Sequence, residues 1–369
     1  MKLLYFHYAI ATFGGIERVI VDKMNSLANM GYEVFCITAN QGKNPLTFKL
    51  NDNIHYEDLN VRTYVQYKYK GLHRYWERFK RNLLLNKRLY EKIKQIRPDI
   101  ILTSTNGYIT DLIRFKSNIP LIVEFHTGFD YIHDNTNTSW YNHYYLKRLL
   151  MTLKKANGIV VLTENDALKW RKRYSNVRVI PNVVHLNTSG IFSMCNNKRV
   201  IFVGRNCKHK AIPDLLKIWQ MVYSKHSDWQ LDMYVERDIK DLLKEANRLN
   251  SNIHIFPPDS NIMNHYIQSS ILVLTSIYES FSLVIAEAMS CGIPVVSFES
   301  DGPCNIITNG KDGFIVKNRS KEEFANRVCQ LIEDSNLRQQ MGQNAIKSVQ
   351  RFSAENVMPK WGELLDSLK

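Results

Sequence analysis

Short runs of apolar and β-branched residues alternate with helix-like patterns along the whole chain. Residues 3–8 form the first apolar run and residues 33–38 the next. Between them a loop ends in Gly14 and Gly15, and apolar residues then recur at helical spacing until Gly31, a residue that favours a helix end. A strand, a glycine loop, a helix and a second strand form a βαβ unit, so the pattern predicts a parallel sheet.

The alternation continues in two blocks of similar length. The strands expected in the rest of the first block lie at residues 100–103, 121–125, 158–162 and 178–180. The strands expected in the second block lie at residues 199–203, 230–234, 253–256, 271–275, 294–298 and 313–316. The helices expected there lie at residues 213–226, 238–249 and 283–289. This order predicts two doubly wound α/β units.

A stretch at residues 186–197, rich in Asn, Thr, Ser and Gly, is typical of a linker between the blocks. We therefore expect two Rossmann-like domains, at residues 1–185 and 196–350, facing each other across a central cleft. A C-terminal helix at about residues 353–369 is expected to pack back on the first domain. Ligands of such folds bind at the carboxyl ends of the strands, which predicts a site in the cleft.

Composition narrows the class of protein. The 369 residues are 44% hydrophobic and 23% charged, which excludes a disordered or collagen-like chain. No apolar run approaches the roughly 20 residues that a membrane span needs. The N-terminus does not continue as a signal peptide, because Glu17 and Arg18 arrive before any cleavage site, so a cytoplasmic protein is expected. The six cysteines lack zinc-binding spacing and are interpreted as reduced thiols.

The net charge of +14 is concentrated in one half of the chain. Residues 1–188 hold 28 Lys and Arg against 15 Asp and Glu, a net charge of +13, which leaves +1 for residues 189–369. This asymmetry indicates that the first half meets a polyanion, either an anionic membrane or a nucleic acid.

The segment at residues 276–296 contains the most informative motif. Glu279 and Glu287 have seven residues between them, and a helix is expected to begin near Phe281. The amides of Ser280, Phe281 and Ser282 would then form a helix N-terminus that suits a phosphate. A carboxylate at Glu287 can bind a ribose diol. Alternatively, Glu279 is a capping acid and Glu287 lies on a solvated helix face.

Three segments in order resemble the retaining, GT-B-fold family 4 glycosyltransferases of the bacterial surface-polysaccharide type. Residues 276–296 resemble the family's E-x7-E signature and the E-A-M-x-x-G-x-P-V-V that accompanies it. Residues 13–18, FGGIER, resemble its N-terminal G-G-x-x-R loop, and residues 201–210, IFVGRNCKHK, resemble the G-R-x-x-x-x-K segment that opens its second domain. The resemblance implies a nucleotide-sugar donor, with UDP favoured, and transfer with retention to a glycan acceptor.

The resemblance also implies roles for individual residues. Arg205 and Lys210 would bind the donor diphosphate, with Lys208 as a substitute for Lys210. Gly14 and Gly15 would let the backbone approach the phosphate and the acceptor closely. The remaining roles are donor binding by Ser280, Phe281, Ser282 and Glu287, and catalytic contacts to the donor sugar by Glu279 and His126.

Two departures from the family pattern lie within these segments. Ala211 stands where a glycine usually follows the lysine, and Ser282 stands at a position often held by glycine. The chain contains no D-x-D motif, so we expect neither a metal nor another cofactor.

Residues 68–97 are expected to form a basic helix. They contain eleven Lys and Arg against Glu77 and Glu91, with apolar residues at helical spacing. A basic amphipathic helix with aromatic residues is typical of an interfacial membrane contact. The resemblance implies a lipid-linked acceptor, because similar family members often act on lipid-diphosphate-linked sugars at the cytoplasmic membrane face. We therefore expect this helix to bind an anionic membrane surface, which would make the enzyme peripheral at the inner face of the plasma membrane. The alternative is a core helix whose basic face is merely solvated.

Two further functions stay open at this point. The basic half would also suit a nucleic-acid-binding protein, although the chain lacks any recognisable nucleic-acid-binding motif, so nucleic acid is not the expected partner. A GT-B-like nucleotide-sugar epimerase is the other alternative.

Overall fold

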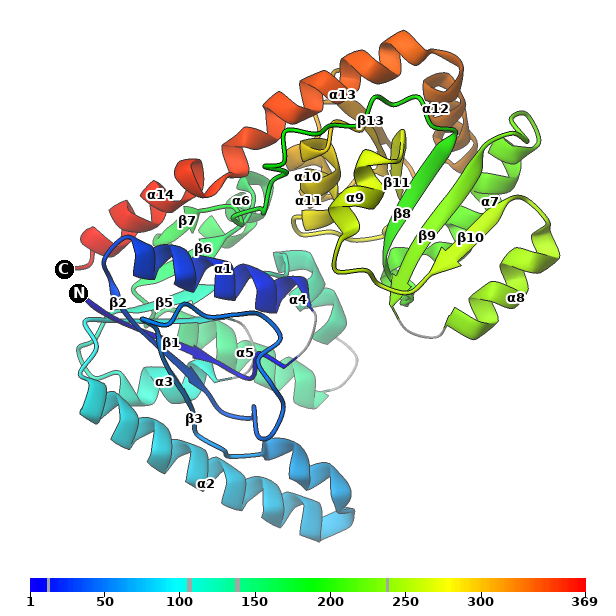
Figure 1. The fold of residues 1–369 in the computed structure, drawn as a ribbon. Helices are drawn as coiled ribbons and strands as arrows, with labels where there is room; N and C mark the ends of the chain where they lie inside the picture. The colour runs from blue at the N-terminus through cyan, green and yellow to red at the C-terminus, as the bar shows by residue number, and fades with distance from the viewer. Residues whose placement is uncertain (12–13, 105–107, 137–139, 237–238) are drawn as a thin grey trace. The chain divides into compact units, whose positions relative to one another are not determined.

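The computed structural model describes residues 1–11, 14–104, 108–136, 140–236 and 239–369, with side chains throughout except at 133–136, 140–143 and 145. The chain divides into two compact units. The first comprises Met1–Val183 together with Val357–Lys369, and the second comprises Val184–Asn356. Figure 1 shows the course of the chain through both units.

The described part of the first unit contains a sheet of seven strands in the order β3-β2-β1-β4-β5-β6-β7, and all neighbouring strands are parallel. The strands are β1 (Lys2–His7), β2 (Glu33–Thr38), β3 (His55–Asp58), β4 (Ile100–Ser104), β5 (Leu121–Glu124), β6 (Gly158–Val161) and β7 (Val177–Val179). The helices are α1 (Gly15–Asn29), α2 (Gly71–Ile96), α3 (Ile109–Phe115), α4 (Phe129–Thr136), α5 (Trp140–Leu153), α6 (Glu164–Arg171) and α14 (Ala354–Asp366), with the 3-10 turn η1 (Thr63–Lys68).

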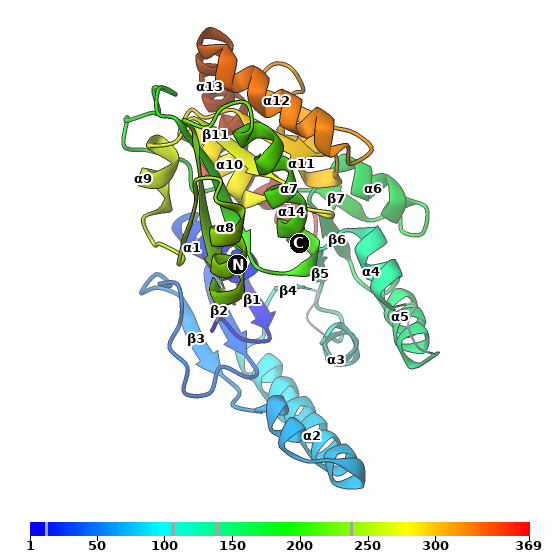
Figure 2. The same cartoon turned by 90° about the vertical axis from the view of Figure 1, so that its right-hand side faces the viewer.

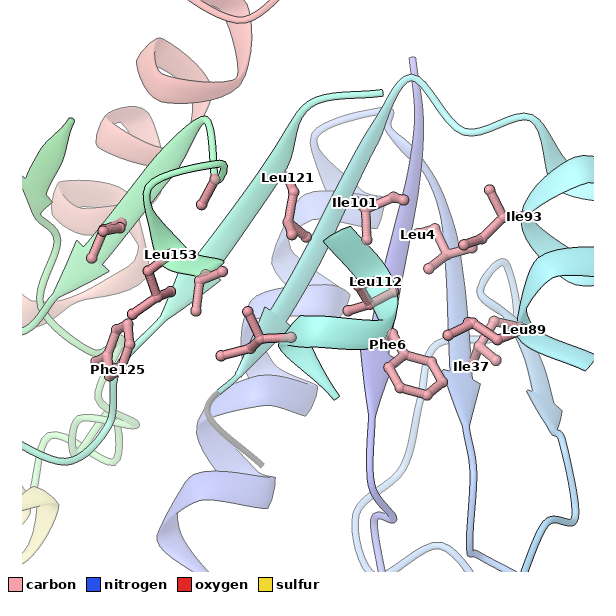
Figure 3. Packing of buried hydrophobic residues seen from close by; sticks show 14 of the residues in the cluster. Leu4, Phe6, Ile37, Leu89, Ile93, Ile101, Leu112, Leu121, Phe125 and Leu153 are labelled. Atoms are coloured by element: carbon pink, nitrogen blue, oxygen red, sulfur yellow. The ribbon is translucent and has the colours of Figure 1, made fainter. Parts of the chain in front are cut away.

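Helices cover both faces of this sheet, which is why its strands are apolar at successive positions. On one face Leu4 and Phe6 belong to a buried cluster with Leu89 and Ile93 of α2 and with residues of α3 and α5. Figure 3 shows Leu89 and Ile93 pointing from their helix toward Leu4 and Ile37 on the strands. On the other face lie α1 and α14.

The described part of the second unit contains six parallel strands in the order β10-β9-β8-β11-β12-β13. The strands are β8 (Arg199–Arg205), β9 (Gln230–Glu236), β10 (Ile253–Phe256), β11 (Ile271–Leu274), β12 (Val295–Phe298) and β13 (Gly313–Val316). The helices are α7 (Ile212–Tyr223), α8 (Ile239–Leu249), α9 (Ile262–Ile267), α10 (Leu283–Ser290), α11 (Asp301–Ile306), α12 (Lys321–Glu333) and α13 (Ser335–Val349), with short turns η2 (Lys208–Lys210) and η3 (Gln350–Phe352).

Both sheets have the strand order of a doubly wound fold, so the prediction of two Rossmann-like α/β units is confirmed. The order reverses between β1 and β4 in the first unit and between β8 and β11 in the second. Loops that follow these strands diverge there and leave room for a ligand. The six cysteines are all free, as their spacing predicts. No helix in the described residues is both long enough and apolar enough to span a bilayer.

The linker expected at residues 186–197 is instead part of the second unit. The amide of Asn187 donates a hydrogen bond to Ser290 Oγ at 3.0 Å, and the amide of Ser193 donates to the carbonyl of Cys291 at 2.8 Å. The backbone at these two positions is therefore tied to the end of α10, although most side chains of the stretch are exposed. The chain returns at Val357, from which point α14 belongs to the first unit.

The helix expected over residues 68–97 is α2, which begins at Gly71 and ends at Ile96. Only the second half of α2 is in the core, where Leu85, Leu89, Ile93 and Ile96 are buried. Residues 67–76 are all exposed. The core-helix interpretation therefore holds for one half of the helix and not for the other. Figure 2, turned by 90°, shows α2 again at the outside of the first unit.

Candidate active site

The two motif-bearing loops of the second unit follow β8 and β11, the strands between which the strand order reverses. Residues 205–211 connect β8 to α7, and residues 275–282 connect β11 to α10. Parallel neighbouring strands end at the same edge of a sheet. The fold therefore brings together two segments that lie far apart in the sequence.

Lys210 and Glu279 meet in an ion pair between these loops. The ammonium of Lys210 contacts Glu279 Oε1, and the hydroxyl of Ser276 donates to the same oxygen at 2.8 Å. The Lys210 and Glu279 side chains are only 12% and 13% exposed. Lys210 and Glu279, which the sequence predicted separately for the donor site, are thus in contact where they are largely shielded from solvent. Electrostatic interactions are strong in such surroundings.

Hydrogen bonds to the backbone hold the two loops against each other. The hydroxyl of Thr275 donates to the carbonyl of Lys210 at 3.0 Å, and the amide of Ile277 donates to the carbonyl of His209 at 2.7 Å. Burial, followed by the nearby Lys210 cation, lowers the pKa of His209. Its imidazole is therefore neutral at pH 7 and adds no charge to those of Arg205 and Lys210.

Arg319 supports this arrangement and is absent from the sequence prediction. Its guanidinium donates to the carbonyls of Thr275 at 3.1 Å and Ser276 at 3.0 Å, and it pairs with Asp214 at 2.9 Å. It thereby fixes the start of the loop that carries Glu279. No local pattern marks this arginine in the sequence, because its partners lie 43 residues and more away along the chain.

The helix predicted to begin near Phe281 begins at Leu283, with Ser282 as its N-cap residue. The Phe281 side chain is buried and packs edge-on against Phe352, with ring centroids 5.1 Å apart. Only the backbone of Phe281 is therefore available for the donor role predicted for it. The backbone of this segment also passes close to Gly302, where a Cβ would lie 2.7 Å from the Phe281 nitrogen.

The alternative interpretations of the two glutamates are both wrong. Glu287 is 5% exposed and so does not lie on a solvated helix face. Glu279 lies outside α10, whose first turn contains no acidic residue, so it is not a capping acid of that helix. Both carboxylates are held in the second unit, one in the loop before α10 and one within it.

Arg205 and Lys208 belong to the same β8–α7 segment but lie outside the buried pair. Arg205 ends β8, and both side chains are exposed. Lys210, not Lys208, is the lysine that contacts Glu279. The predicted substitution of Lys208 for Lys210 therefore finds no support in the contacts.

The first unit carries the predicted His126, two residues beyond the end of β5. Its side chain is buried, and its Nε2 lies 3.7 Å from Glu124 Oε2. Burial, assisted by the Lys23 cation, lowers the pKa of His126 to about 4 although Glu124 opposes the shift. His126 is therefore a neutral imidazole at pH 7.

A buried ion pair adjoins His126 and is a second feature that the sequence prediction lacks. Lys23 of α1 contacts Glu124 Oε1, to which the Tyr5 hydroxyl also donates at 3.0 Å. The Lys23 ammonium lies 4.6 Å from the ring centroids of both Tyr5 and Trp361. Helix α14 is thereby joined to α1 and β5 through one cation.

His7, at the end of β1, is a further buried imidazole near His126. Its Nδ1 lies 2.8 Å from Ser104 Oγ. Burial, followed by the nearby His126 and Lys23, lowers the pKa of His7 to about 3. Two neutral imidazoles therefore occupy the carboxyl end of the first sheet, although sequence inspection singled out only one.

The predicted glycine loop precedes α1. Gly14 is the N-cap of this helix in an extended conformation, and Gly15 is its first residue, whereas Phe13 lies outside the described residues. A Cβ on Gly14 would lie 2.1 Å from Glu17 Oε2. Glu17 Oε2 is the end of a flexible side chain that can turn away, so this contact alone does not require glycine at position 14. Its backbone conformation is open to any residue.

A hollow of about 410 Å³ opens next to this loop, beyond the carboxyl ends of β1 and β2. Tyr8, Tyr64, Asn40, Asn44 and Glu17 line it. Aromatic rings with amide and carboxylate groups suit a sugar, which offers apolar C–H faces and hydroxyl groups. Within the described ranges, no group of three or more His, Cys, Asp or Glu has an arrangement that could hold a metal ion.

Comparison with known protein families identifies the family to which the chain belongs. Residues 13–188 match the family described as "Glycosyltransferase Family 4", and residues 194–348 match "Glycosyl transferases group 1". The two matches cover both units and all three motif-bearing segments. The chain belongs to the family 4 glycosyltransferases. The two-unit GT-B fold expected from the resemblance is confirmed with it.

Two curated relatives match this glycosyltransferase over nearly its full length. The amylovoran biosynthesis glycosyltransferase AmsD of Erwinia amylovora is 25% identical, with 99% of each chain covered. An alpha-1,4-N-acetyl-D-galactosaminyltransferase of Campylobacter jejuni, whose name gives a PP-undecaprenol-linked saccharide as its acceptor, is 23% identical, with 100% of this chain and 99% of the relative covered.

A solved structure shares the fold of the glycosyltransferase. TarM of S. aureus, crystallised as a variant with fondaparinux, alpha-GlcNAc-glycerol and UDP, superposes with a TM-score of 0.78 over 99% of this chain and 100% of TarM, at 15% identity. At this identity the likeness shows the fold alone.

Proposed function

We propose that this enzyme is a retaining glycosyltransferase that moves a sugar from a UDP-sugar to a lipid-linked glycan acceptor in the synthesis of a cell-surface polysaccharide or glycoconjugate. The observation that carries the donor site is the buried contact of Lys210 with Glu279 where the strand order of the second sheet reverses. UDP is favoured because the TarM structure contains it.

The donor diphosphate is assigned to the second unit. Arg205 lies exposed at the end of β8, with Lys210 on the same loop and the amides of residues 280–282 opposite, at the start of α10. Two cations and backbone donors stabilise the negative charge that develops on a leaving diphosphate. Because these groups supply a positive field themselves, we propose a metal-independent donor site.

The two glutamates are assigned to the two ends of the donor. Glu287, buried within α10, is proposed to bind the ribose hydroxyls. Glu279 is proposed to bind hydroxyls of the donor sugar near the reacting carbon, oriented by Lys210 and Ser276. Arg319 acts as a positioning residue, because it holds the loop that carries Glu279.

Transfer is proposed to proceed on one face of the donor sugar. The acceptor oxygen bonds to the anomeric carbon as the bond from that carbon to the diphosphate breaks, and the acceptor proton passes to the departing phosphate. His126 is proposed to line the sugar as a neutral imidazole, in keeping with its lowered pKa. The alpha linkage named for the Campylobacter relative agrees with retention from an alpha-linked donor.

The acceptor is assigned to the first unit. The hollow lined by Tyr8, Tyr64, Asn40 and Asn44 offers stacking surfaces and hydrogen-bonding groups for its terminal sugar, beside the loop of Gly14 and Gly15. A lipid-linked acceptor places the reaction at the inner face of the plasma membrane, with the enzyme as a peripheral protein. The undecaprenol-linked acceptor of the Campylobacter relative supports this proposal.

Nucleotide binding tests the donor site before any acceptor is known. Thermal unfolding is measured with UDP, GDP, ADP and CMP, with and without magnesium. UDP at about 100 times its dissociation constant adds roughly 2.7 kcal/mol of stability, which raises the midpoint of a chain of this length by about 3 to 4 °C. We expect this shift with UDP, without magnesium, and its loss in Arg205→Ala. Lys217→Ala, which removes an exposed lysine from α7, is the matched control and should keep the shift.

Turnover with radiolabelled UDP-sugars and a lipid-linked glycan tests the chemistry. Glu279→Gln and Arg205→Ala should each lower turnover by at least about a hundredfold. Arg205→Ala, at an exposed side chain, should keep the unfolding midpoint of the wild type, whereas Glu279→Gln leaves Lys210 without its partner and should lower it, so turnover is measured well below that midpoint. Near-wild-type transfer by both variants would show that the donor site lies elsewhere.

A further inference from the structure

Helix α2 carries two apolar stripes that face different directions. The residues that enter the core are Leu85, Leu89, Ile93 and Ile96. The second stripe, Leu72, Trp76, Phe79 and Leu83, precedes them in the sequence. At about 100° of rotation per residue, the two stripes point roughly 115° apart around the helix axis. The earlier stripe is therefore not an extension of the core stripe. Continued toward the N-terminus, the core face would instead meet polar residues such as Arg78 and Asn82.

The earlier stripe is exposed. Leu72 is 88% exposed, Trp76 56%, Phe79 53% and Leu83 54%. Tyr67 and Tyr75, at 67% and 68%, lie in the same segment. Isolated apolar side chains are common on protein surfaces, but a run of large ones at one place marks an interaction site. We call residues 64–83 the aromatic-basic segment.

Basic side chains surround these rings. The segment contains six Lys and Arg and one acid, Glu77, which contacts Lys80 at 3.3 Å and Arg81 at 3.7 Å. The Arg74 guanidinium lies 4.8 Å from the Tyr67 ring centroid, and the Lys80 ammonium lies 5.4 Å from that of Trp76. Cations and aromatic rings are thus mixed on one exposed surface.

Two basic residues of the second half of α2 have a structural role. Arg88 donates to the carbonyls of Leu59 and Asn60, and Lys92 pairs with Glu57 at 2.7 Å. These side chains hold β3 and the turn after it against the helix. Lys87 and Lys94 of the same half are exposed, so the first half is distinguished by the exposed rings among its basic residues and not by its charge alone.

We infer that the aromatic-basic segment docks the enzyme on an anionic lipid bilayer. Aromatic side chains with polar edges favour the boundary between lipid and water, and Lys and Arg are attracted by anionic headgroups. A second copy of this chain fits less well, because a two-fold contact would bring two surfaces with a net charge of +5 together. Charge complementarity thus selects the lipid surface as the occupant.

The segment also connects with the acceptor hollow. Tyr64 begins the aromatic-basic segment, is 40% exposed, and lines the hollow beyond β1 and β2. A bilayer bound at this segment would hold a lipid-linked saccharide beside the proposed acceptor site. This connection rests on the proposed function. The inference of bilayer docking does not, because it is argued only from the exposed rings and basic side chains of the aromatic-basic segment.

Co-sedimentation with vesicles tests the docking without any assay of transfer. The full chain is mixed with phosphatidylcholine vesicles containing 30% phosphatidylglycerol, or with phosphatidylcholine alone, at 50 mM and 300 mM salt. We expect binding to the anionic vesicles only, weakened at high salt. Lys70→Gln/Arg74→Gln should reduce the partition coefficient roughly thirtyfold, and Trp76→Ser/Phe79→Ser at least about tenfold.

Matched control variants distinguish binding through the aromatic-basic segment from attraction by the overall positive charge of the protein. Lys87→Gln/Lys94→Gln removes two exposed charges from the same helix, about 20 Å and more from Arg74, and should bind nearly as the wild type does. Leu168→Ser removes an exposed apolar side chain from α6. All the substituted residues are exposed, so every variant should keep the unfolding midpoint of the wild type.

The inference would be overturned by equal binding to neutral and anionic vesicles, by equal losses in the control and test variants, or by a dimer in solution that Trp76→Ser/Phe79→Ser abolishes. Retention of nonspecific DNA at 150 mM salt that depends on Lys70 and Arg74 would instead assign the surface to nucleic acid. A UDP-dependent thermal shift with no vesicle binding would leave the donor site standing and remove the docking surface.

Discussion

The buried ion pair of Lys23 with Glu124 makes a sharp prediction about stability. The two side chains are 3% and 4% exposed, and the same carboxylate accepts a hydrogen bond from Tyr5. Lys23→Met keeps an unbranched side chain of similar shape but leaves the Glu124 carboxylate buried without its cation. Breaking such a pair by removing one partner costs about 3–5 kcal/mol.

Removing both charges should cost much less than removing one. In Lys23→Met/Glu124→Gln the amide still accepts the Tyr5 hydroxyl, and no uncompensated charge stays buried. We expect the double variant to be at least about 2 kcal/mol more stable than Lys23→Met alone. The cycle is measured by urea unfolding followed by far-ultraviolet circular dichroism.

A surface pair in the same unit provides the control. Lys2 and Glu33 lie 4.0 Å apart, with side chains nearly half exposed, so Lys2→Met should change the free energy of unfolding by less than about 1 kcal/mol. A similar small cost for Lys23→Met would refute the reasoning. So would a double variant whose loss equals the sum of the two single losses, since that would show no coupling between the charges.

Two further predictions concern pH and backbone strain. The folded pKa values of His126 and His7, about 4 and about 3, lie below the ordinary 6.5, so the unfolded chain binds these protons first. The stability that the two neutral histidines contribute is complete above pH 6.5. As the pH falls, each histidine loses about 1.4 kcal/mol of this stability per pH unit, down to about pH 4 for His126 and about pH 3 for His7. Unfolding midpoints measured from pH 7 to 4 check this, and a flat profile would contradict it. Ala211 has a left-handed φ of 48°, so Ala211→Gly should raise the stability of the second unit by about 0.5–1 kcal/mol, whereas Ala286→Gly within α10 should lower it by about 1 kcal/mol. Calorimetry that gives the same sign for both substitutions would contradict the strain at Ala211.

The sequence predicted those parts of the donor site that carry a local signal. Glu279 lies after an apolar run and before a helical pattern, and Lys210 follows a second such run, so each has a recognisable place in a βα unit. Their contact then follows from the strand order. Arg319 has no such signal, because it acts through its reach to the carbonyls of Thr275 and Ser276.

The buried network of the first unit was out of reach for the same reason. Lys23 and Glu124 are 101 residues apart, and each looks ordinary in its own segment, one in an amphipathic helix and one at a strand end. Only the packing of α1 on the sheet makes them partners. His7 is similar, since a histidine within an apolar run shows neither its burial nor its neighbour Ser104.

The two departures from the family's glycines have a physical meaning in the structure. Ala211 and Ser282 both adopt left-handed backbone conformations, with φ of 48° and 76°. Glycine reaches this region without the cost that a Cβ brings. A sequence that places other residues at such positions carries strain in the loops that hold Lys210 and Glu279. Strain of this kind persists where the surrounding contacts fix the backbone, and here Thr275 hydrogen-bonds the carbonyl of Ala211 at 3.3 Å.

Helix α2 shows how a sequence pattern can be read too simply. Apolar residues at helical spacing from Leu72 to Ile96 look like one stripe, but the step from Leu83 to Leu85 is two residues, and no helix face has that spacing. The break marks the point at which the helix begins to pack on the sheet. After the break, the apolar side chains from Leu85 to Ile96 pack on the sheet, which explains why they are buried. Before it, the stripe is exposed, so its side chains are explained by a partner outside the unit and not by the fold.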